Sequence, residues 1–492
     1  MKKYIFLIIN IILLSSFQDF LDVQPESNID KDQLFSTEAG FKEALNGVYT
    51  LCASQQLYGE ELTFGNLDVL AQNYDFNDVE LQKIAAFDYS YTAFEENNND
   101  IWTSAYRAIA NCNNILSQID EKKSLFTGKN YELIKGEALC LRAYLHFDVL
   151  RMFAPSFKSQ PEVAGIPYVT NVSTSSTPFS TVTQVLEKAI ADLLAAKALL
   201  AVSDPMLPES YVVGYPDPDI DEDATELNNP DLFLQNRRHR MNYFSACGEL
   251  ARVYLYKNDL SNSLIQAKEV IESEKFPWTR QADVLQTDPE LKDRIYYKEL
   301  VTAWFVPGSL ERLNELYSGE NPGLSATTAQ INDIFEVATI GAEDMRYTQG
   351  FLKKAATAGG TERSLMLKYN RTPEPMSNIH PLVAPAIRLS EMYYIAAEAS
   401  FDTNPGAAVQ YFTSVWRNRG IEKTISGSIT KDEFMDLLVN DARKEFYGES
   451  QIFFMYKRLN YPVKISPTQT YAPSDKIFVF PIPNDEYAYR NN

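Results

Sequence analysis

Two stretches of the sequence share one form: "ELARVYLYKNDLSNSLIQAKEVI" at 249–271 and "EMYYIAAEASFDTNPGAAVQYFTSVW" at 391–416. In each, a helical stretch is followed by a short turn of Asn, Asp or Pro. A second helical stretch then carries alanine every three or four positions. This pattern is typical of tetratricopeptide-type hairpins, in which small residues let helices approach closely and each hairpin buries its face on the next. The spacing between the two units is irregular, which predicts a degenerate array of helical hairpins.

Helical periodicity extends outward from these two stretches over most of the chain. We expect a helical scaffold mainly at 30–155, 179–275 and 386–460, because apolar residues recur there at spacings of three and four. A long irregular region is expected at 276–385, and one strand-like run at 477–480. Irregular stretches of such length are uncommon and usually functional. The predicted fold class is all-α, with a tetratricopeptide-like scaffold and long irregular ligand-binding loops.

Composition restricts the partners of the protein. The 492 residues are 45% hydrophobic and 23% charged, which describes a folded globular chain, and the formal net charge is −21. Nucleic-acid binding depends on Lys and Arg displacing counterions from phosphates, so this charge argues against nucleic acid and against an anionic membrane surface. A neutral ligand, a cation or another protein fits better.

Motifs for metal, cofactor or covalent chemistry do not emerge from the sequence. The acidic stretch "DPDIDED" at 217–223 resembles the start of a calcium loop but lacks the turn glycine and the final bidentate Glu, so we read it as an acidic surface loop. The sequence has no P-loop, H-E-x-x-H, G-x-S-x-G or G-x-G-x-x-G pattern. We therefore predict no metal, no cofactor and no enzymatic activity. The four cysteines are expected to be buried thiols, with one disulfide left open as an alternative: Cys52, Cys112, Cys140 and Cys247.

The first residues are typical of an export signal. Two lysines precede an apolar run that is too short to span a membrane, and Leu14-Ser15-Ser16 ends it. We predict a lipoprotein-type signal peptide at 1–16. Phe17 stands where the lipid-bearing Cys is required, and a phenyl ring has no nucleophilic atom to attach a lipid.

Charged residues lie on an apolar helical face near the C-terminal hairpin. Arg388, Glu391 and Glu398 share about 80° of that face, so either they are a buried ion cluster or the carboxylates are catalytic. We favour the structural interpretation, in which Arg388 neutralises Glu391, and Arg443 or Arg458 neutralises Glu398.

Aromatic residues outside the helical stripes are the predicted ligand-binding set. Sugar rings pack their C–H faces on aromatic rings, while amide and guanidinium groups bind hydroxyls in the ring plane. Each ring taken singly is more often core or rim. The predicted ligand-binding residues are Tyr74, Phe76, Asn77, Tyr89, Tyr91 and Trp304.

Several segments, in this order along the chain, resemble the SusD/RagB family of Bacteroidetes outer-membrane proteins. They are "FLDVQP" at 20–25, "IWTSAYRAIANCNNIL" at 101–116, "GEALCLRAYLHFDVLRMFA" at 136–154, "GIPY" at 165–168, "IRLSEMYYIAAEA" at 387–399, "RKEFYGESQIFFMYKR" at 443–458 and "FPIPNDEY" at 480–487. Within 443–458, Ser450, Ile452 and Met455 replace the usual Gly, Arg and Asp, which predicts that one family salt bridge is rewired.

The resemblance implies a single SusD-like domain at 22–492. Family members look like lipid-anchored, all-helical proteins on the extracellular face of the outer membrane, which bind a glycan or sometimes a peptide. They act as a lid on a TonB-dependent, SusC-like barrel. We therefore expect a cell-surface protein that binds an oligosaccharide and delivers it to such a transporter, with membrane contact through that partner. The alternatives are a peptide-binding tetratricopeptide-type scaffold and, less favoured, an all-helical glycosidase.

Overall fold

The computed structural model describes residues 31–76, 78–319, 322–355, 360–371, 378–466 and 468–490. The predicted signal peptide at 1–16 and Phe17 therefore lie outside the described residues. Within the described ranges, no helix is long and apolar enough to cross a membrane.

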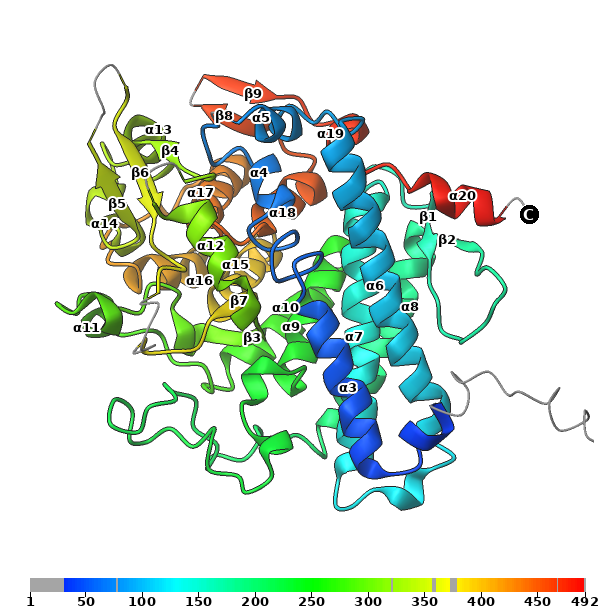
Figure 1. The fold of residues 1–492 in the computed structure, drawn as a ribbon. Coiled ribbons are helices and arrows are strands. Elements are labelled where there is room, and N and C mark those ends of the chain that lie inside the picture. The colour runs from blue at the N-terminus through cyan, green and yellow to red at the C-terminus, as the bar shows by residue number, and fades with distance from the viewer. Residues whose placement is uncertain are drawn as a thin grey trace, which may run out of the picture.

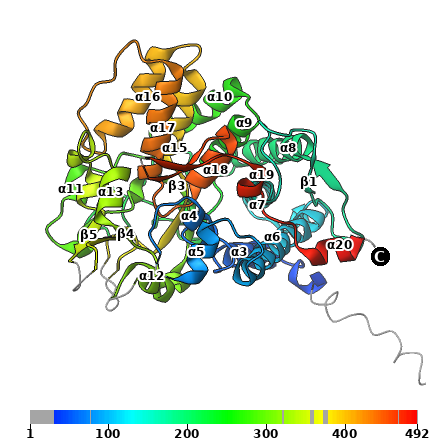
Figure 2. The same ribbon diagram turned by 90° about the horizontal axis from the view of Figure 1, so that it is seen from above.

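The scaffold is a curved row of helices in which each contacts the next (Figures 1 and 2). In order along the row they are α3 (Glu38–Cys52), α6 (Thr92–Ile119), α7 (Asn130–Phe153), α8 (Val182–Leu200), α9 (Tyr243–Tyr256), α10 (Leu260–Ile271), α15 (Leu389–Ser400) and α16 (Pro405–Arg417). Two further helices, α17 (Lys431–Glu445) and α18 (Gln451–Leu459), contact each other, and α17 also packs on α15. Stacking of successive helices is how a solenoid builds a continuous core.

Helix α7 lies inside this row and is buried on all sides. From residue 133 to its C-terminal end, nearly every side chain is buried or almost so. Its contact with α8 is close, since a Cβ on Gly136 would lie 2.9 Å from Cγ of Leu200. A small residue is needed at this point of α7.

The two predicted hairpins are α9–α10 and α15–α16, as expected from the small residues and turns. Asn258 takes a left-handed conformation with φ 61°, and Asp259 caps α10 by accepting from the N–H of Asn262. Asn404 caps α16 in the same way, with Pro405 in the first turn. Helix α10 contacts α15 directly, so the two hairpins are neighbours in space.

The region 276–385 is less irregular than predicted. Strand β3 (Leu300–Phe305) pairs antiparallel with β7 (Val383–Arg388), which runs directly into α15. A three-stranded sheet, in the order β4-β6-β5, lies on the side of the molecule away from α6 to α8 (Figure 1). The shorter elements are α4 (Asn66–Leu70), α5 (Val79–Ala85), α11 (Gln281–Val284), α12 (Leu310–Tyr317), α13 (Thr328–Ile334), α14 (Met345–Thr348), α19 (Asp475–Phe478), α20 (Asn484–Arg490), β1 (Ala164–Pro167), β2 (Phe179–Thr181), β4 (Ala326–Thr327), β5 (Phe351–Lys354), β6 (Arg363–Met366), β8 (Val463–Ser466) and β9 (Gln469–Tyr471).

The predicted fold class is confirmed, since the fold is mostly helical with short strands added. The strand-like run at 477–480 was a wrong prediction, because α19 covers its first half. Phe478 and Phe480 are buried by packing on Phe453, and this packing does not require a strand.

The cysteines are free, buried thiols, so the disulfide alternative is excluded. Burial raises the pKa of each thiol. They pack as small apolar side chains.

The predicted pairing of Arg388 with Glu391 is wrong. Arg388 lies at the junction of β7 and α15 and donates to Glu449 at 2.5 Å, with Glu445 at 3.7 Å. Glu391 instead accepts from Arg252 of α9 at 2.5 Å. Glu391 and Glu449 are both buried, and each pairs with an arginine from another element.

The alternatives for Glu398 are resolved in favour of Arg458, which donates to both of its carboxylate oxygens at 2.6 Å. Arg443 does not join an ion cluster with Glu398. It donates instead to the carbonyl of Gln72 at 2.7 Å and to Oδ1 of Asn73 at 2.8 Å.

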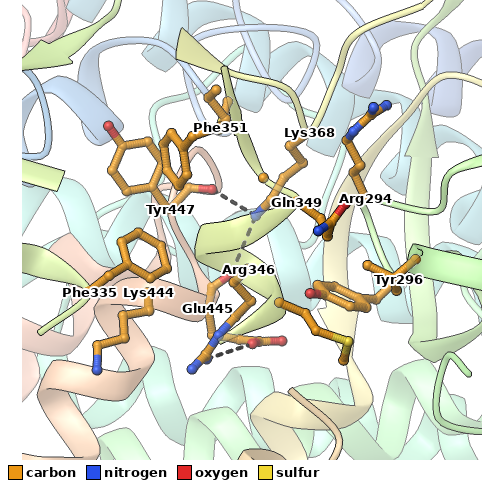
Figure 3. A pocket seen from close by; sticks show the side chains of 14 residues that line it. Arg294, Tyr296, Phe335, Arg346, Gln349, Phe351, Lys368, Lys444, Glu445 and Tyr447 are labelled. Carbon is orange, nitrogen blue, oxygen red and sulfur yellow. Dashed lines mark hydrogen bonds and ion pairs between the residues drawn. The ribbon is translucent and has the colours of Figure 1, made fainter. Parts of the chain in front are cut away.

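A buried ion network joins α17 to the loops before it. Arg346 pairs with Asp441, and Arg419 pairs with Glu445. Arg346 also pairs with Glu445 (Figure 3). Lys368 donates to the carbonyl of Tyr447 at 2.7 Å beside a small cavity that these residues line. The surrounding arginines hold the pKa of Glu445 well below its usual range despite burial.

Candidate functional site

Two open hollows of about 520 and 400 Å³ share Asn236, His239 and Phe305, and together they form the Phe305 cleft. Helix α3 contributes one wall, and the other walls come from residues 232–240, 304–308 and 378–381. The residues that line the cleft are Asn46, Tyr49, Thr50, Ala53, Pro216, Leu227, Leu232, Gln235, Asn236, His239, Arg240, Trp304, Phe305, Val306, Pro307, Gly308, Asn378, His380 and Pro381.

Phe305 presents an aromatic ring to this cleft. It is the last residue of β3, and strand alternation places its side chain on the opposite face from the buried Trp304. The ring of Phe305 is 48% exposed and stacks on His239 with centroids 5.8 Å apart and an interplanar angle of 7°. The stacking fixes the orientation of an exposed ring face.

The two histidines that line the cleft, His239 and His380, are uncharged at neutral pH. Burial, helped by neighbouring Arg238, lowers the pKa of His239 to about 3. Burial and Arg371 also lower the pKa of His380, whose ring stacks on Tyr297 at 5.0 Å. Both histidines therefore contribute uncharged aromatic rings to the lining of the cleft.

Arg240 supplies directional hydrogen-bond donors beside the rings. Its guanidinium lies 4.6 Å from the ring centroid of Tyr49, donates from Nε to Glu137 at 3.0 Å and from Nη1 to Asn46 at 2.8 Å. Its Nη2 is buried and has no hydrogen-bond partner among the described residues. An unpartnered buried donor is costly, so Nη2 is a group that a ligand hydroxyl would satisfy.

Exposed apolar side chains border the cleft. Leu232 is 79% exposed and Leu227 is 41% exposed, on either side of the shared residues. With Phe305 they give an apolar rim around amide and guanidinium groups. This combination suits a ligand with flat C–H faces and equatorial hydroxyls.

Trp304 lines the cleft but cannot serve as an exposed stacking platform. It is 2% exposed, and its ring stacks on Tyr58 at 4.4 Å and meets Tyr144 edge-on at 5.6 Å. Trp304 lies in the region predicted to be irregular, where an exposed side chain is expected. Pairing of β3 with β7 instead directs the indole into the core.

The structure places Tyr74 and Phe76 elsewhere. Tyr74 is 5% exposed, donates its hydroxyl to Asp68, and packs edge-on against Tyr447. It lines a separate hollow that shares no residue with the Phe305 cleft. Phe76 is half-buried against Tyr74.

Tyr89 and Tyr91 lie at a third location. Tyr89 is half-buried, stacks on Phe94 at 4.5 Å and donates its hydroxyl to the carbonyl of Ile477. Tyr91 is half-buried at the N-cap of α6. Asn77 lies outside the described residues. The structure thus does not bring the predicted set together.

Sequence reasoning missed Phe305, His239 and Arg240. The signal available for Phe305 was its place next to Trp304 in a β-branched and aromatic run, where two consecutive rings must face opposite ways. His239 and Arg240 carry no comparable local signal, because their roles depend on contacts with residues far along the chain.

Comparisons with known proteins agree on one family. A family model described as "Starch-binding associating with outer membrane" matches residues 19–210, and one described as "SusD family" matches residues 361–490. The SusD-like protein P25 of Formosa agariphila is 25% identical over 197 residues, and the match covers 38% of this chain but little more than a third, 36%, of that relative.

Solved structures share the fold over nearly the whole chain. A SusD-like carbohydrate binding protein from Bacteroides vulgatus matches with a TM-score of 0.70 at 18% identity, covering 93% of this chain and 97% of its own. A SusD superfamily protein from Bacteroides thetaiotaomicron matches with a TM-score of 0.69 at 19% identity, covering 92% and 98%.

Proposed function

The chain belongs to the SusD/RagB family, and from this premise we propose that it binds a carbohydrate in the Phe305 cleft without catalysing a reaction. The observation that carries the proposal is the exposed ring of Phe305, held parallel to neutral His239 and flanked by Arg240 with an unpartnered Nη2. The ring would pack on a sugar face while Nη2 donates to a hydroxyl in the ring plane.

We further propose that the protein works at the extracellular face of the outer membrane and passes its ligand to a TonB-dependent, SusC-like barrel. One matching family model is described as associating with the outer membrane, which supports the location. The transporter partner is tested by copurification from the native membrane, in which the barrel should be retained with the tagged chain. Recovery of the chain without a barrel would contradict this part.

Binding is tested by a glycan array followed by calorimetry on the best ligand with Phe305→Ala. We expect a loss of about 1–2 kcal/mol of binding free energy, as for removal of an aromatic contact at a partly exposed site. Tyr487→Ala is the matched control, because Tyr487 is 49% exposed on α20 and does not line the cleft. Equal affinity of Phe305→Ala and wild type would place the ligand elsewhere.

The same preparations separate the alternative functions. A glycosidase would release shorter sugars from the bound glycan, whereas we expect the ligand to be recovered intact after prolonged incubation. A peptide-binding scaffold would bind peptides and no glycan on the arrays.

A further inference from the structure

The hollow that contains Tyr74 is separate from the Phe305 cleft and has a different chemistry. Its volume is about 660 Å³, and it lies between α13, the C-terminal half of α17 and β8. We name it the Arg443 hollow, lined by Tyr74, Asp75, Thr327, Ala329, Gln330, Asn332, Asp333, Ile334, Glu336, Val337, Ala338, Thr339, Asn440, Arg443, Lys464, Ile465 and Ser466.

Arg443 is unusual among the buried arginines of this protein. In the described ranges, all but one of the other buried arginines lie within 4 Å of a carboxylate. The exception is Arg371, which donates to the carbonyls of His380 and Pro381. The ion-paired ones are Arg142, Arg151, Arg237, Arg238, Arg252, Arg346, Arg388 and Arg419. Arg443 is 6% exposed and has no such carboxylate, although a buried guanidinium is normally paired.

Its hydrogen bonds leave part of the guanidinium unused. Nε donates to Asn73 and Nη2 donates to the carbonyl of Gln72. Neither acceptor carries a charge, and no bond from Nη1 is found within the described part of the chain. Among the residues that the structure describes, the charge of Arg443 therefore has no carboxylate counter-ion.

Lys464 of β8 lines the same hollow and adds a second positive charge. It is half-buried, and its Nζ donates at 2.7 Å to Oδ1 of Asn440, which is also neutral. Burial lowers the pKa of Lys464, and nearby Arg443 lowers it further. The two cations repel each other in a partly desolvated place, where an anion between them would relieve the repulsion.

The described carboxylates of the hollow form no ion pair with Arg443 or Lys464. Asp75 is paired with Arg363 at 2.8 Å, and Glu336 is paired with Lys444 of α17 at 2.5 Å. Asp333 is exposed to solvent, where its charge is screened. Exposed Asp436 and, more weakly, Glu336 raise the pKa of Lys464, but among the described residues neither forms an ion pair with it within 4 Å.

We propose that the Arg443 hollow binds an oxyanion of a carbohydrate, a carboxylate or a sulfate ester, between Arg443 and Lys464. The planar guanidinium and the ammonium both donate charge-assisted hydrogen bonds to such a group. The amides of Asn332, Asn440 and Gln330 lie around the hollow to meet the sugar hydroxyls. That the oxyanion belongs to a sugar rests on the proposed function, whereas the oxyanion site rests on the geometry of the hollow.

An oxyanion site in the Arg443 hollow would give the protein selectivity for acidic glycans. With a net charge of −21, the chain repels anions in general. A site with two cations that lack protein counter-ions would select those sugars that carry the charge in the right place.

The test is calorimetry with two matched pairs of ligands, digalacturonic acid against its dimethyl ester, and galactose 6-sulfate against galactose. We expect digalacturonic acid, galactose 6-sulfate or both to bind more tightly than the matched neutral ligand. The ligand pair whose two affinities differ identifies the oxyanion as a carboxylate or a sulfate ester. Lys464→Gln should weaken the anionic ligand about tenfold, as for the loss of one charge-assisted hydrogen bond. Arg443→Gln should have at least the same effect if its melting temperature stays near that of wild type.

Lys431→Gln is the matched control, because it removes one positive charge from α17 at a residue 50% exposed and paired with Asp402, away from the hollow. It should leave the affinities unchanged. Equal binding of both matched pairs, or unchanged affinity in Lys464→Gln, would overturn the proposal. If neutral glycans bind and Phe305→Ala weakens them, the proposed function stands even when the oxyanion site fails its test. The proposed function and the oxyanion site can therefore fail separately.

Discussion

At the scale of single residues, the sequence identified which charges are embedded in apolar surroundings but not their partners. Arg388, Glu391 and Glu398 are all largely buried, as predicted, although Arg388 ends β7 and only Glu391 and Glu398 lie on α15. The partners, however, come from α9, α18 and the loop before α18. Periodicity specifies the face of a helix, whereas the residue opposite that face depends on tertiary packing.

We expect Arg388→Met to destabilise the protein by about 3 kcal/mol, the low end for a broken buried ion pair, because it removes one of the two cations, Arg388 and Lys368, that pair with buried Glu449. The residue affected should be Glu449, 2.5 Å from Arg388, and not Glu391. Urea denaturation of a double-mutant cycle checks this. Arg388→Met and Glu449→Gln should be strongly coupled, whereas Arg388→Met and Glu391→Gln should be additive within about 0.5 kcal/mol.

A second cycle serves as the positive control for that experiment. Arg252→Met and Glu391→Gln should be coupled, since Arg252 holds both oxygens of Glu391. Strong coupling between residues 388 and 391 would instead restore the pairing that the helix face suggested.

At the scale of elements, long helices were predictable and short strands were not. The helices of the curved row follow spacings of three and four that the sequence displays, whereas β3 and β7 are far apart in sequence and pair only in the folded chain. The candidate site could not be predicted for the same reason, because it depends on strand pairing between distant segments. Phe305 is exposed because β3 pairs with β7 in the register that turns Trp304 inward, and no local pattern encodes that register.

The ribbon of β3 and β7 lies close to α9, and a glycine makes the approach possible. A Cβ on Gly248 would lie 2.8 Å from Cγ2 of Ile387 in β7. Gly248→Ala should therefore destabilise the protein by about 1–3 kcal/mol through overpacking, measured by urea denaturation. Gly47→Ala is the matched control within α3, where the added methyl meets nothing within 4 Å and should stabilise by about 0.5–1 kcal/mol. Equal effects at both positions would show that the α9–β7 contact is loose.

At the scale of the whole molecule, the fold was predictable because its evidence is spread over the whole chain. Segments from 20–25 to 480–487 together indicated the family, and the solved relatives share the fold over more than nine-tenths of the chain. A binding site has no such redundancy. Some of the six predicted residues are aromatic rings buried in the core. Aromatic residues are suited both to core packing and to ligand binding, and the sequence does not show which of them the loops leave exposed.

We predict that Phe17, which lies outside the described residues, decides whether the protein carries a lipid anchor. The lysines, the apolar run and Leu14-Ser15-Ser16 match a lipoprotein signal, but lipid transfer requires a thiolate where Phe17 stands. We expect the chain with Phe17 to carry no lipid and Phe17→Cys to become lipidated, as measured by fatty-acid labelling and membrane fractionation in a Bacteroidetes host. Phe17→Ser is the control for the substitution itself and should remain unlabelled. Carbohydrate binding should be equal in all three, because the helical row begins only at the Thr37 cap of α3. Lipid on the chain with Phe17 would refute this account. If the unlabelled chains stay at the membrane only when the barrel is present, the barrel is the anchor. Such anchoring requires an interface on the order of 1,600 Å² or more.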